Sequence, residues 1–128
     1  MLVAHAGRDH ACLTAEILKS GGVKLIILFE THDRPITPIT VAMVKIPAKA
    51  VRVEDGKEFV LVFQPAPETA RPPGEAAGTS SRFECVVAEL QPNDKITVTT
   101  EVQMGKRARK VRWGNFVPSR FASPKPNE

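Results

Sequence analysis

Residues 50–63, AVRVEDGKEFVLVF, decide the fold of this chain. Apolar side chains alternate along two short arms that meet at the pair Asp55-Gly56. An Asp-Gly pair tolerates the positive φ angles of a type I′ turn, whose twist matches that of two paired strands. The stretch therefore predicts an antiparallel β-hairpin. The alternating apolar residues of its two arms are Val51, Val53, Phe59, Leu61 and Phe63.

Further strands are predicted on both sides of this hairpin. Residues 23–29, VKLIILF, form a continuous rather than alternating run that is rich in apolar and β-branched residues, which is typical of a central strand covered on both faces. Residues 39–46 alternate between apolar and other side chains and are bounded by prolines, which lack a backbone donor and so favour strand ends. Three more strands are predicted downstream, over residues 82–90, 95–104 and about 109–117.

The segment 8–22, RDHACLTAEILKSGG, fits two structures. A short helix would have Asp9 as its N-cap and Gly21 after its last turn. A strand would instead turn at residues 20–22 into the next strand. We favour the strand because helical periodicity over so few residues is weak and the rest of the chain is predicted to be β. A short N-terminal helix over residues 9–20 remains the alternative.

These elements predict a mainly β fold. Six or seven short strands favour a small antiparallel barrel or sandwich of the size of OB or SH3-like domains. A chain of 128 residues fits one domain, which we place at residues 1–117, followed by a flexible C-terminal tail at 118–128. Residues 64–82 are rich in proline and small polar side chains, so they predict a mobile loop within that domain.

Charge is distributed unevenly along the chain. The net charge is +4, yet residues 102–127 hold seven of the 18 basic residues and no acidic one. The rest of the chain therefore carries 11 basic against 14 acidic residues, a balance of −3. Such an asymmetry favours a polyanionic partner for the basic part of the chain.

The basic stretch 105–116, GKRARKVRWGNF, combines cations with aromatic residues. Cations neutralise phosphates and release condensed counterions, and exposed aromatic side chains provide a stacking surface for bases. We therefore predict a non-catalytic module that binds nucleic acid, single-stranded DNA or RNA in particular. The predicted nucleic-acid-binding residues are Lys106, Arg107, Arg109, Lys110, Arg112, Trp113, Phe116 and Arg120.

Two other interpretations of the basic stretch stand beside this one. In a strand, Val111 and Trp113 would face the core while Arg112 faces water, so that the charges only solvate an edge strand. The second functional hypothesis is a structural or adaptor subunit of a larger assembly, such as a virion or a multiprotein complex. Such a subunit would act through strand edges or the Pro-rich loop, and it is compatible with a homo-oligomer.

Catalytic and metal-binding patterns are weak. None of the three histidines lies in a recognisable nucleophile motif. A metal site would need His5, His10 and Cys12 together with Cys85 or His32, but this spacing matches no closed zinc pattern. We therefore predict no enzymatic activity, no metal and no cofactor.

The expected location is the cytoplasm, without membrane insertion. The longest apolar run, residues 25–29, is far below the roughly 20 residues that span a bilayer. Residues 1–12 lack the continuous apolar centre of a signal peptide. The two cysteines, Cys12 and Cys85, are accordingly expected to be reduced.

Overall fold

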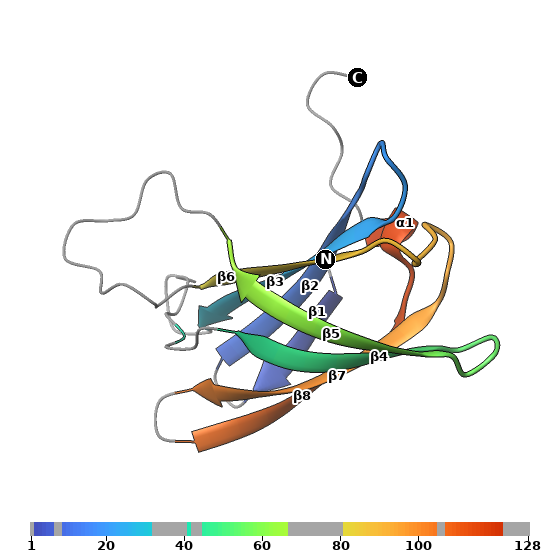
Figure 1. Cartoon of the computed structure of the whole chain (residues 1–128). Helices are drawn as coiled ribbons and strands as arrows, with labels where there is room; N and C mark the ends of the chain where they lie inside the picture. The colour runs from blue at the N-terminus through green and yellow to red at the C-terminus, as the bar shows by residue number, and fades with distance from the viewer. Residues whose placement is uncertain are drawn as a thin grey trace.

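The computed structural model describes residues 2–6, 9–31, 41, 45–66, 81–104 and 107–121. In these residues eight strands are followed by a single helical turn, and Figure 1 shows the strands curved around a common interior. The elements are β1 (Leu2–Ala6), β2 (Asp9–Ile17), β3 (Val23–Thr31), β4 (Ile46–Arg52), β5 (Glu58–Pro65), β6 (Arg82–Val87), β7 (Ile96–Met104), β8 (Arg107–Phe116) and α1 (Pro118–Phe121).

The strands form one antiparallel sheet in the order β1-β2-β3-β6-β5-β4-β7-β8. The two outermost strands, β1 and β8, lie against each other, so the sheet is a nearly closed barrel. The prediction of a small, mainly β antiparallel barrel is confirmed. No helix in the described ranges is long and apolar enough to cross a membrane.

The predicted hairpin is formed by β4 and β5. Phe59, Leu61 and Phe63 alternate with exposed residues along β5 and point into the core. The connecting turn differs from the predicted type I′ turn, because Gly56 has a positive φ of 73° but Asp55 does not. Residues 53–56 form a four-residue loop instead, closed by the hydrogen bond from the Arg52 N–H to the Lys57 carbonyl at 2.8 Å.

The N-terminal segment is a strand, so the alternative of a short helix is wrong. Ala11, Leu13 and Ala15 of β2 point into the core with a period of two, and β2 pairs with β3 along its whole length. Hydrogen bonds to β3 satisfy the backbone N–H and C=O groups of this segment, which in a helix would have to bond within the segment itself. Sequence reasoning did not predict β1, which pairs with β2 from the register Leu2↔Leu13 to Ala6↔Asp9.

Pro47 lies inside β4 rather than at a strand end. Most of the strand predicted at 39–46 lies outside the described residues, and β4 begins only at Ile46. The β4–β7 ladder starts only at Ala48↔Thr100, one residue after Pro47. No neighbouring strand therefore needs the backbone donor that proline lacks.

A β-bulge in β8 sets the direction of its last side chains. Trp113 pairs with Val98 and Phe116 pairs with Ile96, so two residues of β8 lie opposite one residue of β7. Asn115 has a φ of 54° and occupies the bulge. The extra residue lets both Trp113 and Phe116 point inward, although an unbroken strand would place them on opposite faces.

The first residues of the predicted C-terminal tail pack against the barrel. Phe121 at the end of α1 stacks on Phe116, with ring centroids 4.9 Å apart. Its carbonyl oxygen accepts a hydrogen bond from the Thr14 hydroxyl at 2.6 Å. The rest of the tail, 122–128, lies outside the described residues. So does most of the predicted loop, since β5 continues to Pro65 and β6 begins at Arg82.

Candidate nucleic-acid interface

The two predicted aromatic binding residues belong to the core. Trp113 is 1% exposed and Phe116 is 0% exposed. The Trp113 indole N–H donates to the Ala11 carbonyl oxygen at 2.9 Å, which satisfies its only donor inside the barrel. The expectation that these rings offer a stacking surface for bases is therefore corrected: strand alternation turns Trp113 into the core, and the β8 bulge turns Phe116 there as well.

Two of the cations of β8 lie on its outer face. Lys110 and Arg112 are exposed and alternate with the inward-facing Val111 and Trp113. Arg109 is half-buried near the end of the ladder, where it pairs with Val102, and alternation places it on the same side of β8 as Val111. Strand alternation thus separates the charged face from the aromatic face that the sequence places beside it.

Of the three remaining predicted cations, only Arg120 has a described side chain. Arg120 is exposed on α1. Arg107 begins β8, but its side chain is not among those described, and Lys106 lies outside the described residues.

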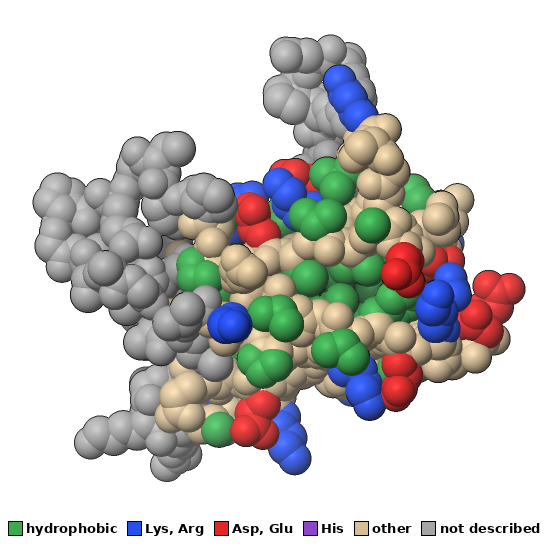
Figure 2. All heavy atoms as spheres, viewed as in Figure 1, with side chains coloured by type: hydrophobic (Ala, Val, Ile, Leu, Met, Phe, Trp, Pro, Cys, Tyr) green, Lys and Arg blue, Asp and Glu red, His purple; other side chains and the backbone are tan. Residues whose placement is uncertain are grey.

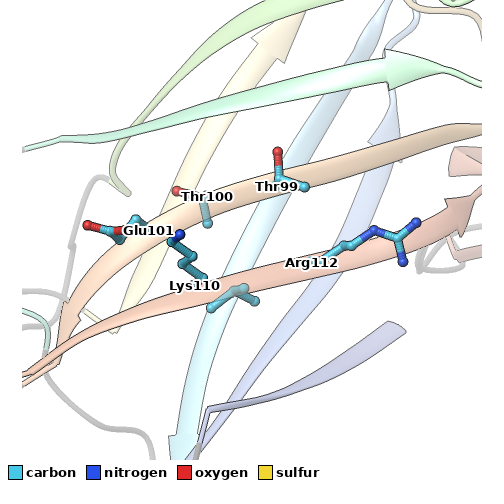
Figure 3. A pocket seen from close by; sticks show the side chains of 6 residues that line it. Thr99, Thr100, Glu101, Lys110 and Arg112 are labelled. Atoms are coloured by element: carbon cyan, nitrogen blue, oxygen red, sulfur yellow. The ribbon is translucent and has the colours of Figure 1, made fainter.

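A shallow hollow lies between β7 and β8 on the outer face. Its volume is about 400 Å³, and Figure 3 shows the side chains that line it. Arg112 is directly opposite Thr99, and Lys110 is directly opposite Glu101. The lining residues are Thr99, Thr100, Glu101, Lys110, Val111 and Arg112.

Arginines of the C-terminal segment 107–121 differ from those elsewhere in how they are paired. Arg52 contacts Asp55 at 3.0 Å and Asp94 at 3.3 Å, and Arg82 contacts Glu84 at 3.1 Å. Among the described residues, by contrast, Arg109, Arg112 and Arg120 form no salt bridge. Their guanidinium donors remain open to an anion.

The same face also carries negative charge. Glu101 is the cross-strand neighbour of Lys110, and Glu58 pairs with Lys49 at 2.9 Å. Lys49 of β4 lies opposite Thr99 and so next to the hollow, a position that only the strand register reveals. An anion bound here would meet three cations but compete with two carboxylates, which makes the expected affinity moderate and sensitive to salt.

The guanidinium of Arg112 lies over a glycine. An added Cβ at Gly114 would be 3.3 Å from Arg112 Nη1. The missing side chain therefore gives the guanidinium space to lie along the backbone of β8. Gly114 was not predicted as a site residue. Its proximity to the guanidinium depends on the conformation of the Arg112 side chain, which the sequence does not show.

The groups considered for metal binding are not brought together in the described residues. No group of three or more His, Cys, Asp or Glu side chains in them is placed to hold a metal ion. Cys12 is buried on β2 with its Sγ donating to Glu30 at 3.9 Å, whereas Cys85 lies on β6 with β3 between them. Burial raises the pKa of both thiols, and the Glu30 carboxylate raises that of Cys12 further.

Comparison of the chain with protein-family models, curated proteins and solved structures finds no match.

Proposed function

We propose that this chain is a non-catalytic module that binds nucleic acid through its phosphates, on the outer face of β7 and β8. Lys110 and Arg112 of β8 are the central contacts, with Thr99 of β7, opposite Arg112, as a neutral hydrogen-bonding neighbour. Trp113 and Phe116 have no part in it because both are buried. Affinity is electrostatic and independent of base sequence.

The observation that carries the proposal is the set of open arginines at the C-terminal end of the chain. A guanidinium without a carboxylate partner keeps its planar set of donors for bidentate contact with a phosphate. Arg109, Arg112 and Arg120 are in this state in the described structure, unlike Arg52 and Arg82. This contrast supports a role in binding beyond solvation of an edge strand.

Titration of a labelled single-stranded oligonucleotide tests the proposal. At about 50 mM salt we expect Lys110→Ala/Arg112→Ala to lower the affinity roughly tenfold or more, since two phosphate contacts are lost. The control Lys19→Ala/Lys57→Ala removes the same charge from the turns and should change affinity much less. No binding by the unaltered protein, or an equal loss in both double variants, would overturn it.

An adaptor subunit is the second candidate, because one part of the sheet is left unfinished. β5 and β6 share only two residue pairs, although β3–β6 and β4–β5 each share six. Exposed valines line both strands beyond that short ladder. Unpaired strand edges of this kind accept strands from other polypeptides.

A further inference from the structure

The ladder between β5 and β6 ends long before the strands do. It consists of Gln64↔Glu84 and Pro65↔Phe83, extended by the hydrogen bond from the Ala66 N–H to the Arg82 carbonyl at 3.0 Å. Over residues 58–62, β5 pairs only with β4, and over residues 85–87, β6 pairs only with β3. We call the open stretch between 58–62 and 85–88 the β5–β6 seam.

Backbone groups on the β5 side of the seam point into it. Successive residues of a strand direct their N–H and C=O groups to opposite sides, and the Ala66 N–H points to β6. The backbone N–H and C=O groups of Val62 and Val60 therefore also point toward β6. Burial raises the pKa of Cys85 and the nearby Val62 N–H lowers it, and the described β5–β6 ladder holds no pair that includes Val62. The main-chain donors and acceptors that a strand would use thus face an open gap.

Exposed apolar side chains stand on both sides of the seam. Val60 is 85% exposed and Val62 is 43% exposed on β5, while Val86 on β6 is 58% exposed. Two adjoining hollows of about 310 and 400 Å³ lie between the strands, with the buried Phe59 and Leu61 among the lining of the first. Figure 2, viewed onto this face, shows hydrophobic side chains on either side of a hollow.

Charged residues around the seam neutralise one another. Lys57 pairs with Glu89 at 3.5 Å across the end where the strands diverge, and Lys24 pairs with Glu84 at 3.8 Å near the closed end. Glu58 is held by Lys49. Among the described residues, the charged side chains around the seam are thus paired with one another, and valines dominate its middle.

We propose that the β5–β6 seam is a docking site for an extended, uncharged segment of a partner protein, which adds a strand beside β5. The open edge of five residues, 58–62, matches a short strand of about 15 Å. Main-chain hydrogen bonds provide affinity, and the exposed valines select β-branched or other apolar side chains on the outer face. The site is separate from the β7–β8 hollow and uses none of its residues.

Selection of displayed random peptides of about eight residues on the full chain tests this proposal. We expect enrichment of peptides that are poor in proline and charge and rich in Val, Ile and Thr at alternate positions. Binding of such a peptide should slow amide exchange at Val60, Val62 and Val86. Enrichment of acidic peptides, or protection confined to β7 and β8, would contradict the seam as the site.

Backbone variants sharpen the test. Val60→Pro removes a donor that faces the seam but leaves the β4–β5 ladder bonds, so peptide affinity should fall about fivefold or more. Val60→Thr keeps both the donor and the β-branched shape and should retain affinity within about twofold. Val62→Lys and Val86→Lys keep the backbone unchanged and should weaken peptide binding by adding charge. These two variants test the proposal even if Val60→Pro does not fold. Unchanged affinity in both lysine variants would refute the proposal.

Failure of this site is distinguishable from failure of the nucleic-acid site. Lys110→Ala/Arg112→Ala should leave peptide affinity unchanged, and Val62→Lys should not lower oligonucleotide affinity. Loss of both activities in either variant would show that the two surfaces are not independent and would overturn the seam as a separate site.

Discussion

The indole Nε1 of Trp113 donates a hydrogen bond to the carbonyl oxygen of Ala11 at 2.9 Å, joining β8 to β2, two strands that are not neighbours in the sheet. This contact fixes the ring inside the barrel, while Lys110 and Arg112 of the same strand lie on the outer face. It divides the basic and aromatic stretch into buried aromatic residues and solvent-exposed cations.

Replacing Trp113 should destabilise the fold. Trp113→Phe keeps an aromatic ring but leaves the Ala11 carbonyl without its donor, which costs about 1–3 kcal/mol. Urea denaturation measures the difference in the free energy of unfolding. A variant as stable as the unaltered protein would show that the hydrogen bond contributes nothing.

The fluorescence of Trp113, the single tryptophan of the chain, reports directly on its burial. We expect emission that iodide barely quenches and that a bound oligonucleotide leaves unchanged, because the ring is 1% exposed. Strong quenching of this emission by oligonucleotide would mean that Trp113 stacks on bases and that the core assignment is wrong.

The bulge residue Asn115 should tolerate glycine but not a β-branched residue. Its φ of 54° lies in the left-handed region, where a Cβ-bearing residue other than Asn or Asp costs about 1–2 kcal/mol. We expect Asn115→Val to lower the free energy of unfolding by about that amount and Asn115→Gly to change it by less than about 0.5 kcal/mol. Equal stabilities of the two variants would argue against the bulge.

The helical turn α1 should stabilise the barrel through Phe121. Phe121→Ala removes the stacking on Phe116, and because the side chain is half-buried we expect a loss of about 1–2 kcal/mol, below that of a fully buried ring. The neighbouring Arg120→Ala removes an exposed side chain and should cost less than about 0.5 kcal/mol. Thermal unfolding measures both variants. Equal losses of stability in Phe121→Ala and Arg120→Ala would refute the packing role of Phe121.

The two thiols should alkylate slowly at neutral pH. Burial raises the pKa of Cys12 and of Cys85, so less reactive thiolate is present than in the unfolded chain. Because the folded chain holds these protons more tightly, their contribution to stability is complete below the ordinary thiol pKa and is lost as the pH rises through the folded pKa.

Mass spectrometry of iodoacetamide-treated protein measures both rates as a function of pH. Cys85, which is half-buried in the seam, should react faster than the fully buried Cys12. A peptide in the β5–β6 seam should protect Cys85 selectively. Reaction of Cys12 first, or at the rate of unfolded protein, would contradict the placement of the two side chains.

Much of the barrel was predictable from local patterns. The alternation in β5 and the continuous apolar run of β3 identify strands because each pattern reflects how the strand is covered. Segments whose structure is decided by tertiary pairing were harder to predict from the sequence. The strand at Asp9–Ile17 is fixed by its full register with β3, and Pro47 is tolerated because of where the β4–β7 ladder starts.

The candidate site was predicted in its charges but not in its geometry. Lys110 and Arg112 follow from composition, since residues 102–127 hold no acidic residue. The burial of Phe116 depends on a bulge at Asn115 that changes the alternation of β8. The β5–β6 seam was missed because it is a failure of two strands to pair, which neither strand shows by itself.

The salt dependence of oligonucleotide binding tests the central claim most directly. For single-stranded nucleic acid each phosphate contact contributes about 0.7 to the slope of log K against log salt. Loss of two contacts in Lys110→Ala/Arg112→Ala should therefore reduce the magnitude of that slope by about 1.4, while Lys19→Ala/Lys57→Ala leaves it unchanged. A slope that is the same in Lys110→Ala/Arg112→Ala as in the unaltered protein would contradict binding of phosphates by the outer face of β8.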